Sequence, residues 1–191
     1  MKHNFARRDN KISTAKELTV MGLLIALTTM ATMFFKVPTH IGYTHLGDAM
    51  VFIAAILLGK KRGMVVAALG MCLADLLGGY FIWAPITFSI KGIMALITAA
   101  IAYRGNYEGK SIINNIFACI LGGIWMIVAY YLANILLTMY VYTKDATFIQ
   151  SVVVAFYDSL IPNIIEVLIG IIIAVPIIKV LNNKQIYIIN K

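Results

Sequence analysis

The sequence predicts an all-α integral membrane protein, a bundle of six transmembrane helices with both termini in the cytoplasm. Of its 191 residues, 61% are hydrophobic and only 13% are charged, and the mean hydropathy is +0.89. Soluble domains carry about 25% charged residues, so this composition is that of a membrane protein. The net charge of +8 comes from basic residues at the ends of apolar segments, which argues against a nucleic-acid partner.

The apolar segments set the expected number of spans. A spanning helix needs about 20 mostly apolar residues. Two shorter apolar runs, 46–58 and 63–78, flank the charged turn 59–62, and we expect them to form a hairpin of short spans. Five spans or a re-entrant hairpin is the alternative. The remaining spans are predicted in four longer segments: 18–36, 85–103, 112–138 and 158–178.

The distribution of Lys and Arg supports this topology. With the N-terminus inside, thirteen of the 16 basic residues fall on the cytoplasmic side, only Lys36 and Lys144 fall outside, and Lys91 lies within a helix. This asymmetry follows the positive-inside rule. We therefore expect a membrane domain over 18–181, preceded by a basic cytoplasmic tail, 1–17, and followed by a short cytoplasmic tail, 182–191.

Five ionisable residues lie in or at the ends of the apolar segments. They are Asp48, Asp75, Lys91, Asp158 and Glu166. Such groups are costly in a bilayer, and by default they mark a functional site or a buried pair. On the predicted topology all five lie toward the outer face. A polar cavity open to the outside is the simplest explanation.

Uncharged residues extend this cluster into a predicted small-molecule pocket. Residues three or four apart on a helix share a face, and several polar pairs near the outer ends have this spacing. Aromatic walls with a few convergent polar groups are typical of ligand pockets. The predicted substrate-binding residues are Lys91, Glu166, Asn134, Asn163, Trp83, Asp158, Tyr130, Thr87, Tyr43, His45 and Asp48.

Within this set we expect two hydrogen-bonding groups, Lys91 and Glu166, and two orienting amides, Asn134 and Asn163. Trp83 is expected to form a stacking wall.

Several of these residues have a purely structural alternative. Trp83 fits an aromatic belt at the membrane interface. Asp48 and Asp158 fit solvated helix N-caps. Lys91 fits a partner of Asp75 or Glu166 that only holds the bundle together, and Asp75 itself is expected to be structural.

The sequence gives no indication of catalysis or of a metal centre. It contains no phosphate-binding loop, zinc-protease motif or nucleophile elbow, so we expect no catalytic residue, no enzyme activity and no cofactor. The loop histidines His40 and His45 have no clear third ligand, so no metal site is expected. Uphill transport by this chain would need energy from elsewhere.

Four sequence runs carry a family resemblance: HLGDAMVF at 45–52, GKKRG at 59–63, ADLLGGY at 74–80 and WAPITFSIKG at 83–92. They resemble S components, the substrate-binding subunits of energy-coupling-factor (ECF) transporters, in the branch with riboflavin-, pyridoxine- and hydroxymethylpyrimidine-type members. The resemblance covers nearly the whole chain and is concentrated over 45–100.

This resemblance implies a six-helix protein of the prokaryotic plasma membrane that captures a vitamin or precursor at its outer face. Its partners would be a membrane T component and two cytoplasmic ATPases. Family members dock through small residues on the first helix, and the matching positions are Gly22 and Ala26, with Gly in place of the first Ala of the pattern.

The leading hypothesis is therefore an S component. Four carboxylates against one lysine disfavour a strongly anionic ligand, so pyridoxine or hydroxymethylpyrimidine is favoured, then riboflavin. The alternative is a stand-alone proton-coupled secondary transporter in which Asp75 or Glu166 relays the proton, but no internal repeat typical of such carriers is found. An intramembrane enzyme would need paired catalytic groups, which the sequence does not offer.

Overall fold

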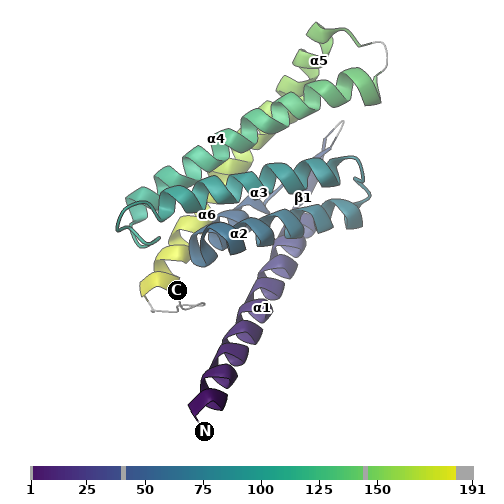
Figure 1. Ribbon diagram of the computed structural model, residues 1–191. Helices are drawn as coiled ribbons and strands as arrows, with labels where there is room; N and C mark the ends of the chain where they lie inside the picture. Colours follow the sequence, from purple (N-terminus) through teal and green to yellow (C-terminus); the bar gives the residue numbers. More distant parts are fainter. Residues whose placement is uncertain (1, 40–41, 144–145, 184–191) are drawn as a thin grey trace.

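The protein is a bundle of long helices with one short strand pair, seen in a computed structural model that describes residues 2–39, 42–143 and 146–183 (Figure 1). Side chains are described from Ala15 onward. The elements, in chain order, are α1 (Lys2–Phe34), β1 (Lys36–Pro38), β2 (Tyr43–His45), α2 (Asp48–Gly78), α3 (Trp83–Ala102), α4 (Ile112–Leu137), the π-helical η1 (Thr138–Tyr142), α5 (Phe148–Ala155), the π-helical η2 (Phe156–Leu160) and α6 (Ile161–Asn183).

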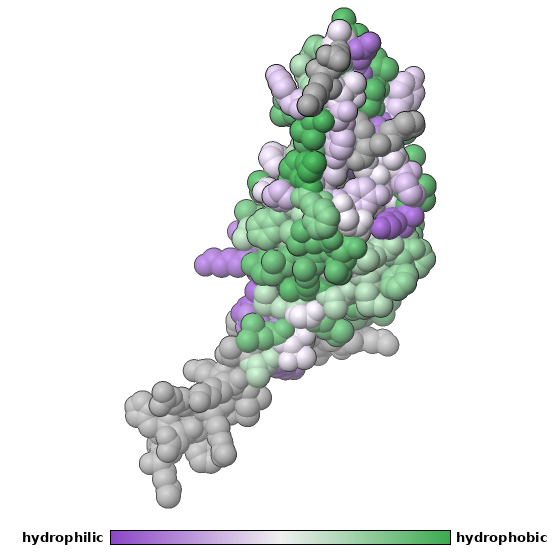
Figure 2. All heavy atoms as spheres, turned by 90° about the vertical axis from the view of Figure 1, so that its right-hand side faces the viewer, coloured by the Kyte–Doolittle hydropathy of each residue, from purple (hydrophilic) through white to green (hydrophobic). Residues whose placement is uncertain are grey.

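The all-α membrane class agrees with this structure. Among the described residues, four helical stretches are long and apolar enough to cross a membrane: Ala15–Phe34, Trp83–Ala102, Ile112–Tyr142 and Phe148–Asn182. Figure 2 shows hydrophobic residues covering the middle of one face, with more polar residues toward its upper end. The count of six spans and the cytoplasmic position of both termini stay predictions.

Two helical stretches begin earlier than the predicted spans. Helix α1 begins at Lys2 and so includes most of the segment expected as a cytoplasmic tail, 1–17, and the cytoplasmic position of that segment stays a prediction. The last predicted span began at Asp158, but the helical stretch starts ten residues earlier. There the side chain of Thr147 caps α5 by accepting from Gln150 N, and the Gln150 side chain accepts from Thr147 N in return. The predicted C-terminal tail, 182–191, lies outside the described residues beyond Asn183.

The element α2 is a helical hairpin rather than one straight helix. Gly59 interrupts it with φ 76° and ψ −170°, a conformation that favours glycine. A Cβ placed on Gly63 would lie 2.7 Å from Ala55 Cα, eight residues back along the chain. In a continuous helix these positions are about 12 Å apart along the axis, so the chain must reverse at Gly59. The structure therefore contains the hairpin expected for 46–58 and 63–78.

The two arms of α2 differ in length. Residues 48–58 extend about 16 Å, roughly half of a hydrocarbon core about 30 Å thick, whereas residues 60–78 extend about 28 Å. At the turn, Arg62 forms an ion pair with Glu17 of α1, with a second contact of 2.8 Å between Arg62 Nη2 and Glu17 Oε2. The turn is thereby tied to the N-terminal half of α1.

Small residues allow the helices to approach closely. Gly70 faces Thr28 of α1, Gly122 of α4 faces Thr98 of α3, and Gly170 of α6 packs against Phe52 and the start of α2. Such contacts replace the hydrophobic drive that is missing in lipid. By contrast, Gly22 and Ala26 are exposed on α1, and a Cβ on Gly22 would meet nothing within 4 Å.

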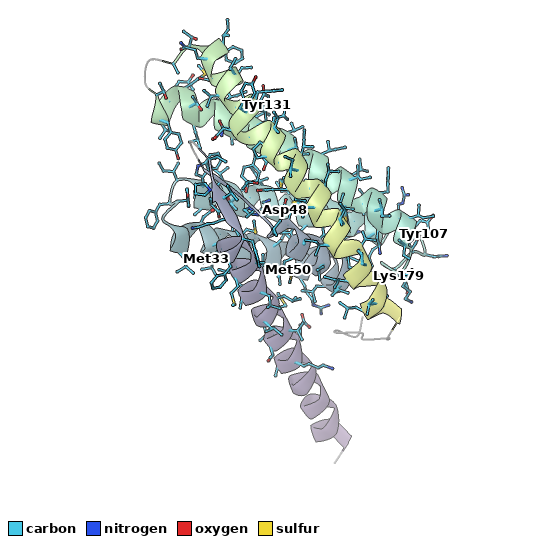
Figure 3. The ribbon with its side chains drawn as sticks, turned by 180° about the vertical axis from the view of Figure 1, so that it is seen from behind. Met33, Asp48, Met50, Tyr107, Tyr131 and Lys179 are labelled. Carbon is cyan, nitrogen blue, oxygen red and sulfur yellow. The ribbon has the colours of Figure 1, made fainter. Side chains whose placement is uncertain are left out.

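Figures 1 and 3 show how the bundle ends are arranged. The β1–β2 loop lies at one end of the hairpin α2, and the strands pair antiparallel, with Lys36 opposite His45 and Pro38 opposite Tyr43. Tyr107 and Lys179 lie together at one end of the bundle and Tyr131 toward the other (Figure 3). The polar residues of the candidate site meet at the end of the bundle that carries the β1–β2 loop.

We predict that Gly63→Ala destabilises the hairpin, because the new methyl group would lie 2.7 Å from Ala55 Cα and 3.0 Å from Ala54 O. Overpacking of this kind costs about 1–3 kcal/mol. Thermal unfolding of the purified protein in detergent measures the loss. Gly22→Ala is the matched control and should keep or slightly raise the melting temperature, since Ala favours helix and the site is open. Equal melting of Gly63→Ala and wild type would contradict the reversed chain.

Candidate functional site

A cavity lies where the β1–β2 loop meets α2, α3, α4, η2 and α6. Its empty volume is about 510 Å³, part of it open to the surroundings. The lining residues are Thr39, Gly42, Tyr43, His45, Asp75, Trp83, Thr87, Tyr130, Asn134, Asp158, Ser159, Pro162, Asn163 and Glu166.

A buried ion pair adjoins this cavity without lining it. Lys91 of α3 and Asp48 at the start of α2 are both 0% exposed, and the Lys91 ammonium donates to Asp48 Oδ1. The same ammonium lies 2.8 Å from Met126 Sδ and 5.2 Å from the centroid of the Tyr130 ring. Figure 3 shows Asp48 well inside the bundle. Asp48 is therefore not a solvated cap, and it pairs with Lys91 in place of Asp75 or Glu166.

Glu166 connects α6 to the loop strand β2. Its Oε1 accepts from Thr44 Oγ1 at 2.7 Å and from His45 N at 2.6 Å, and the residue is only 4% exposed. A carboxylate that accepts two such bonds is well compensated for its burial. These two hydrogen bonds tie the strand β2 to α6.

His45 is a neutral member of this cluster at pH 7. Burial, helped by the charge of Lys91, lowers the pKa of His45 to about 4. Its Nδ1 accepts a hydrogen bond from Gly47 N at 3.2 Å, which agrees with an unprotonated nitrogen. The 3.9 Å approach of His45 Nδ1 to Glu166 Oε1 is therefore not an ion pair at this pH.

Asp75 lies on the second arm of α2 and faces the cavity. Tyr43 OH donates to Asp75 Oδ1 at 2.5 Å, and Oδ2 is buried without a hydrogen-bond partner among the described residues. Burial, followed by the negative charge of Asp75, raises the pKa of Tyr43, so the phenol stays protonated and its O–H donates a hydrogen bond to the carboxylate. Next to this pair, Tyr130 OH donates to Thr87 Oγ1 at 3.0 Å.

Aromatic rings form two groups at the cavity. The Tyr43 ring lies 4.6 Å from that of Tyr80 and 5.4 Å from that of His45, measured between centroids. Trp83 lies 6.0 Å from Tyr130 and is only 7% exposed. This buried position does not fit the alternative of a lipid-facing belt residue. The arrangement offers flat apolar surfaces beside the carboxylates.

The π-helical segment η2 supplies the remaining wall. Asp158 and Ser159 both lie in it, so Asp158 is inside a helix rather than at an N-cap. Asn163 Nδ2 donates to Ser159 Oγ at 3.0 Å. Irregular helical turns of this kind occur frequently at functional sites.

Comparison with known proteins gives the family. Residues 11–183 match the family model described as "ECF-type riboflavin transporter, S component". The chain belongs to this family. One curated relative is also similar, an "Uncharacterized protein in gap 3'region" from Pyrococcus woesei. It is 32% identical over 104 residues, which cover 53% of this chain and 67% of the relative.

The family membership confirms the predicted resemblance. This S component is a substrate-binding subunit of a vitamin transporter and belongs to a multi-pass membrane protein family, not to an enzyme family. Nine of the eleven predicted substrate-binding residues line its cavity, and Asp48 and Lys91 lie outside the lining. Whether the lining residues bind solute stays a prediction.

The sequence interpretation missed several lining residues of this S component: Thr39, Gly42, Asp75, Ser159 and Pro162. Asp75 was noted as an intramembrane carboxylate but was expected to be structural. Ser159 follows Asp158 directly and is four residues before Asn163. This spacing places Ser159 and Asn163 on one helix face and can be read from the sequence. Thr39 and Gly42 belong to a loop whose fold no periodic pattern reveals, and the neighbouring His40 lies outside the described residues.

Three cavity-side groups have the spacing of metal ligands. Donor atoms of His45, Asp48 and Glu166 lie within 4.8 Å of one another, and all three residues are buried. Each already has a partner: Gly47 N for His45, the Lys91 ammonium for Asp48 and the β2 donors for Glu166. A metal ion would have to compete with the Lys91 charge, so we assign no metal site to this S component.

We predict that Lys91→Met lowers the free energy of unfolding by about 3–5 kcal/mol, because it leaves the Asp48 carboxylate buried and uncompensated. The double variant Asp48→Leu/Lys91→Met should recover much of this loss, which thermal unfolding in detergent measures. Lys110→Met is the control, since its ion pair with Glu108 is exposed and should cost little. Additive losses from Asp48→Leu and Lys91→Met would contradict a coupled pair.

Proposed function

We propose that this S component is the high-affinity binding subunit of an ECF-type importer for a small water-soluble vitamin or its precursor. The observation that carries the proposal is the cavity of about 510 Å³, in which carboxylates, amides and aromatic rings converge inside an otherwise apolar bundle. Membership of the S-component family agrees with it.

For the solute itself we propose pyridoxine or hydroxymethylpyrimidine, then riboflavin. The name of the matching family points to riboflavin. The cavity lining favours a smaller uncharged or positively charged ring, because its ionisable side chains include Asp75, Asp158 and Glu166. Trp83 would stack on the ring, and Asn134 and Asn163 would orient it through their amides.

The proposed topology has six spans, both termini in the cytoplasm and the cavity open to the outside. The two arms of α2 supply the second and third spans. The excess of Lys and Arg on the side of the Gly59 turn, including Arg62, supports a cytoplasmic position for that turn. The cavity lies at the opposite end of the hairpin, near Asp75 and the β1–β2 loop.

The proposed protein partners are a membrane T component and two cytoplasmic ATPases. Gly22 and Ala26 are both exposed on α1. Small exposed residues on an outer helix let a second membrane helix approach closely, which supports docking there. ATP hydrolysis by the partners would supply the energy that this chain has no motif to provide.

Transport by reconstituted protein tests this proposal. The solute that copurifies with the protein is identified by mass spectrometry, and its labelled form is offered to proteoliposomes. We expect uptake only when the T component and both ATPases are present with ATP. Uptake by this chain alone, driven by a proton gradient, would instead support the secondary transporter in which Asp75 or Glu166 carries the proton.

A further inference from the structure

We propose that Arg104 binds the phosphate group of an anionic phospholipid. Arg104 lies in the connection between α3 and α4, residues 103–111, and no residue of this connection lines the cavity. Three features support the inference: the fixed position of the guanidinium, its lack of an acidic partner among the described residues, and the apolar face of α4 beside it.

A hydrogen bond and two aromatic rings hold the Arg104 guanidinium. Its Nε donates to Asn114 Oδ1 at 2.8 Å. The Asn114 amide is held in turn, because its Nδ2 donates to two carbonyl oxygens at the end of α3, at 2.9 and 3.3 Å. The guanidinium carbon lies 5.1 Å from the ring centroid of Phe117 and 5.8 Å from that of Tyr107, within the range of cation–π contacts. The side chain is therefore oriented before a ligand arrives.

The outer edge of the guanidinium suits an anion with two oxygens. The hydrogen bond to Asn114 uses Nε, and among the described residues the two Nη groups have no hydrogen-bond acceptor. The ion pairs between described residues do not include Arg104, and Glu108 of the same connection pairs with Lys110 at 2.7 Å. Two parallel N–H groups match two oxygens of a phosphate, a geometry that lysine does not offer. Arg104 is exposed, so a ligand can reach this edge.

Positively charged residues surround this site. Tyr103 OH donates to Ile56 O at 2.7 Å, which places the connection beside the Gly59 turn of α2. Asn182 Nδ2 of α6 donates to Gly109 O of the connection at 3.0 Å. The exposed lysines of the turn and of this part of α6 are Lys60, Lys61 and Lys179. Basic residues at a membrane surface attract anionic lipids, so a negatively charged headgroup is favoured here over a zwitterionic one.

The exposed face of α4 offers a path for an acyl chain. Its large apolar residues next to the connection are exposed by 82, 42, 41 and 50%, and they are Ile113, Phe117, Ile120 and Ile124. Their spacing places them on one side of the helix, and Phe117 is the residue whose ring contacts the guanidinium. The stripe lies within the candidate span Ile112–Tyr142. A free phosphate ion would use only the guanidinium, whereas a phospholipid would use the guanidinium and the stripe, so we favour the phospholipid.

Lipid binding to the purified full chain in detergent tests this inference. The probes are dioleoylphosphatidylglycerol and dioleoylphosphatidylcholine, which share their acyl chains, together with inorganic phosphate. Native mass spectrometry gives the apparent dissociation constant of each lipid from the fraction of chain that carries one lipid. For wild type we expect phosphatidylglycerol to bind about tenfold more tightly than phosphatidylcholine, as a charge-assisted contact implies. Inorganic phosphate in excess over the lipid should not displace it.

Two substitutions assign the preference to Arg104. In Arg104→Gln the preference for phosphatidylglycerol should fall to about twofold or less, because the charge and the paired N–H groups are both lost. In Arg104→Lys the charge stays but the paired N–H groups are lost, so the affinity for phosphatidylglycerol should fall about threefold. Lys60→Gln is the matched control: it removes one exposed charge from the neighbouring turn and should keep the preference within about twofold of wild type.

Several results would overturn the inference. These are equal binding of the two lipids by wild-type protein, binding of neither lipid, a preference that survives in Arg104→Gln, and equal losses in Arg104→Gln and Lys60→Gln. Displacement of the lipid by inorganic phosphate would indicate a free phosphate ion and would overturn it as well. The melting temperature of each variant without added lipid shows that it is folded, and Arg104→Lys decides the outcome if Arg104→Gln does not fold.

Discussion

The structure depends on the ion pair between Asp48 and Lys91. Lipid excludes charge, and both residues are completely buried, so neither can remain without the other. The pair joins the first residue of α2 to the middle of α3, and Met126 of α4 completes the surroundings of the ammonium. Gly170 of α6 packs directly against Asp48 and Ala49. Four helices therefore meet around one neutralised charge.

This pair also explains why the cavity is acidic. The Lys91 ammonium donates to Asp48, and neither residue lines the cavity. Glu166 accepts from the backbone and hydroxyl donors of β2, and Asp75 Oδ1 accepts from the Tyr43 hydroxyl. Asp48 Oδ2 and Asp75 Oδ2 are both buried without a hydrogen-bond partner among the described residues, and of these two residues only Asp75 lines the cavity.

Much of this arrangement could be predicted from the sequence. Hydropathy and the GKKRG turn predicted the α2 hairpin, because a glycine and three charges cannot continue an apolar span. The intramembrane charges, with the polar and aromatic residues spaced around them, predicted nine of the fourteen residues that line the cavity. The pairing of Lys91 with Asp48 was not predicted, because helical spacing places residues on one face of one helix but says nothing about which helix lies opposite.

The positions of Asp158 and Asp75 also depend on tertiary structure. The alternative for Asp158 was a solvated helix N-cap, where a carboxylate is favoured, and Asp75 was expected to be structural. In the structure α5 and η2 extend the last helical stretch back to Phe148, so Asp158 lies inside it, and the hairpin turns Asp75 toward the β1–β2 loop. Both outcomes depend on tertiary contacts between distant segments, which local patterns in the sequence do not contain.

The central claim is that the cavity opens to the outside and holds a solute. Asn163 lines it and is half-buried, so a cysteine there, with Cys72 and Cys119 replaced by alanine, reports access. The account predicts that a membrane-impermeant maleimide labels Asn163→Cys in right-side-out vesicles and that the copurified solute slows this labelling. Labelling that requires permeabilised vesicles, or that saturating solute does not slow, would contradict it.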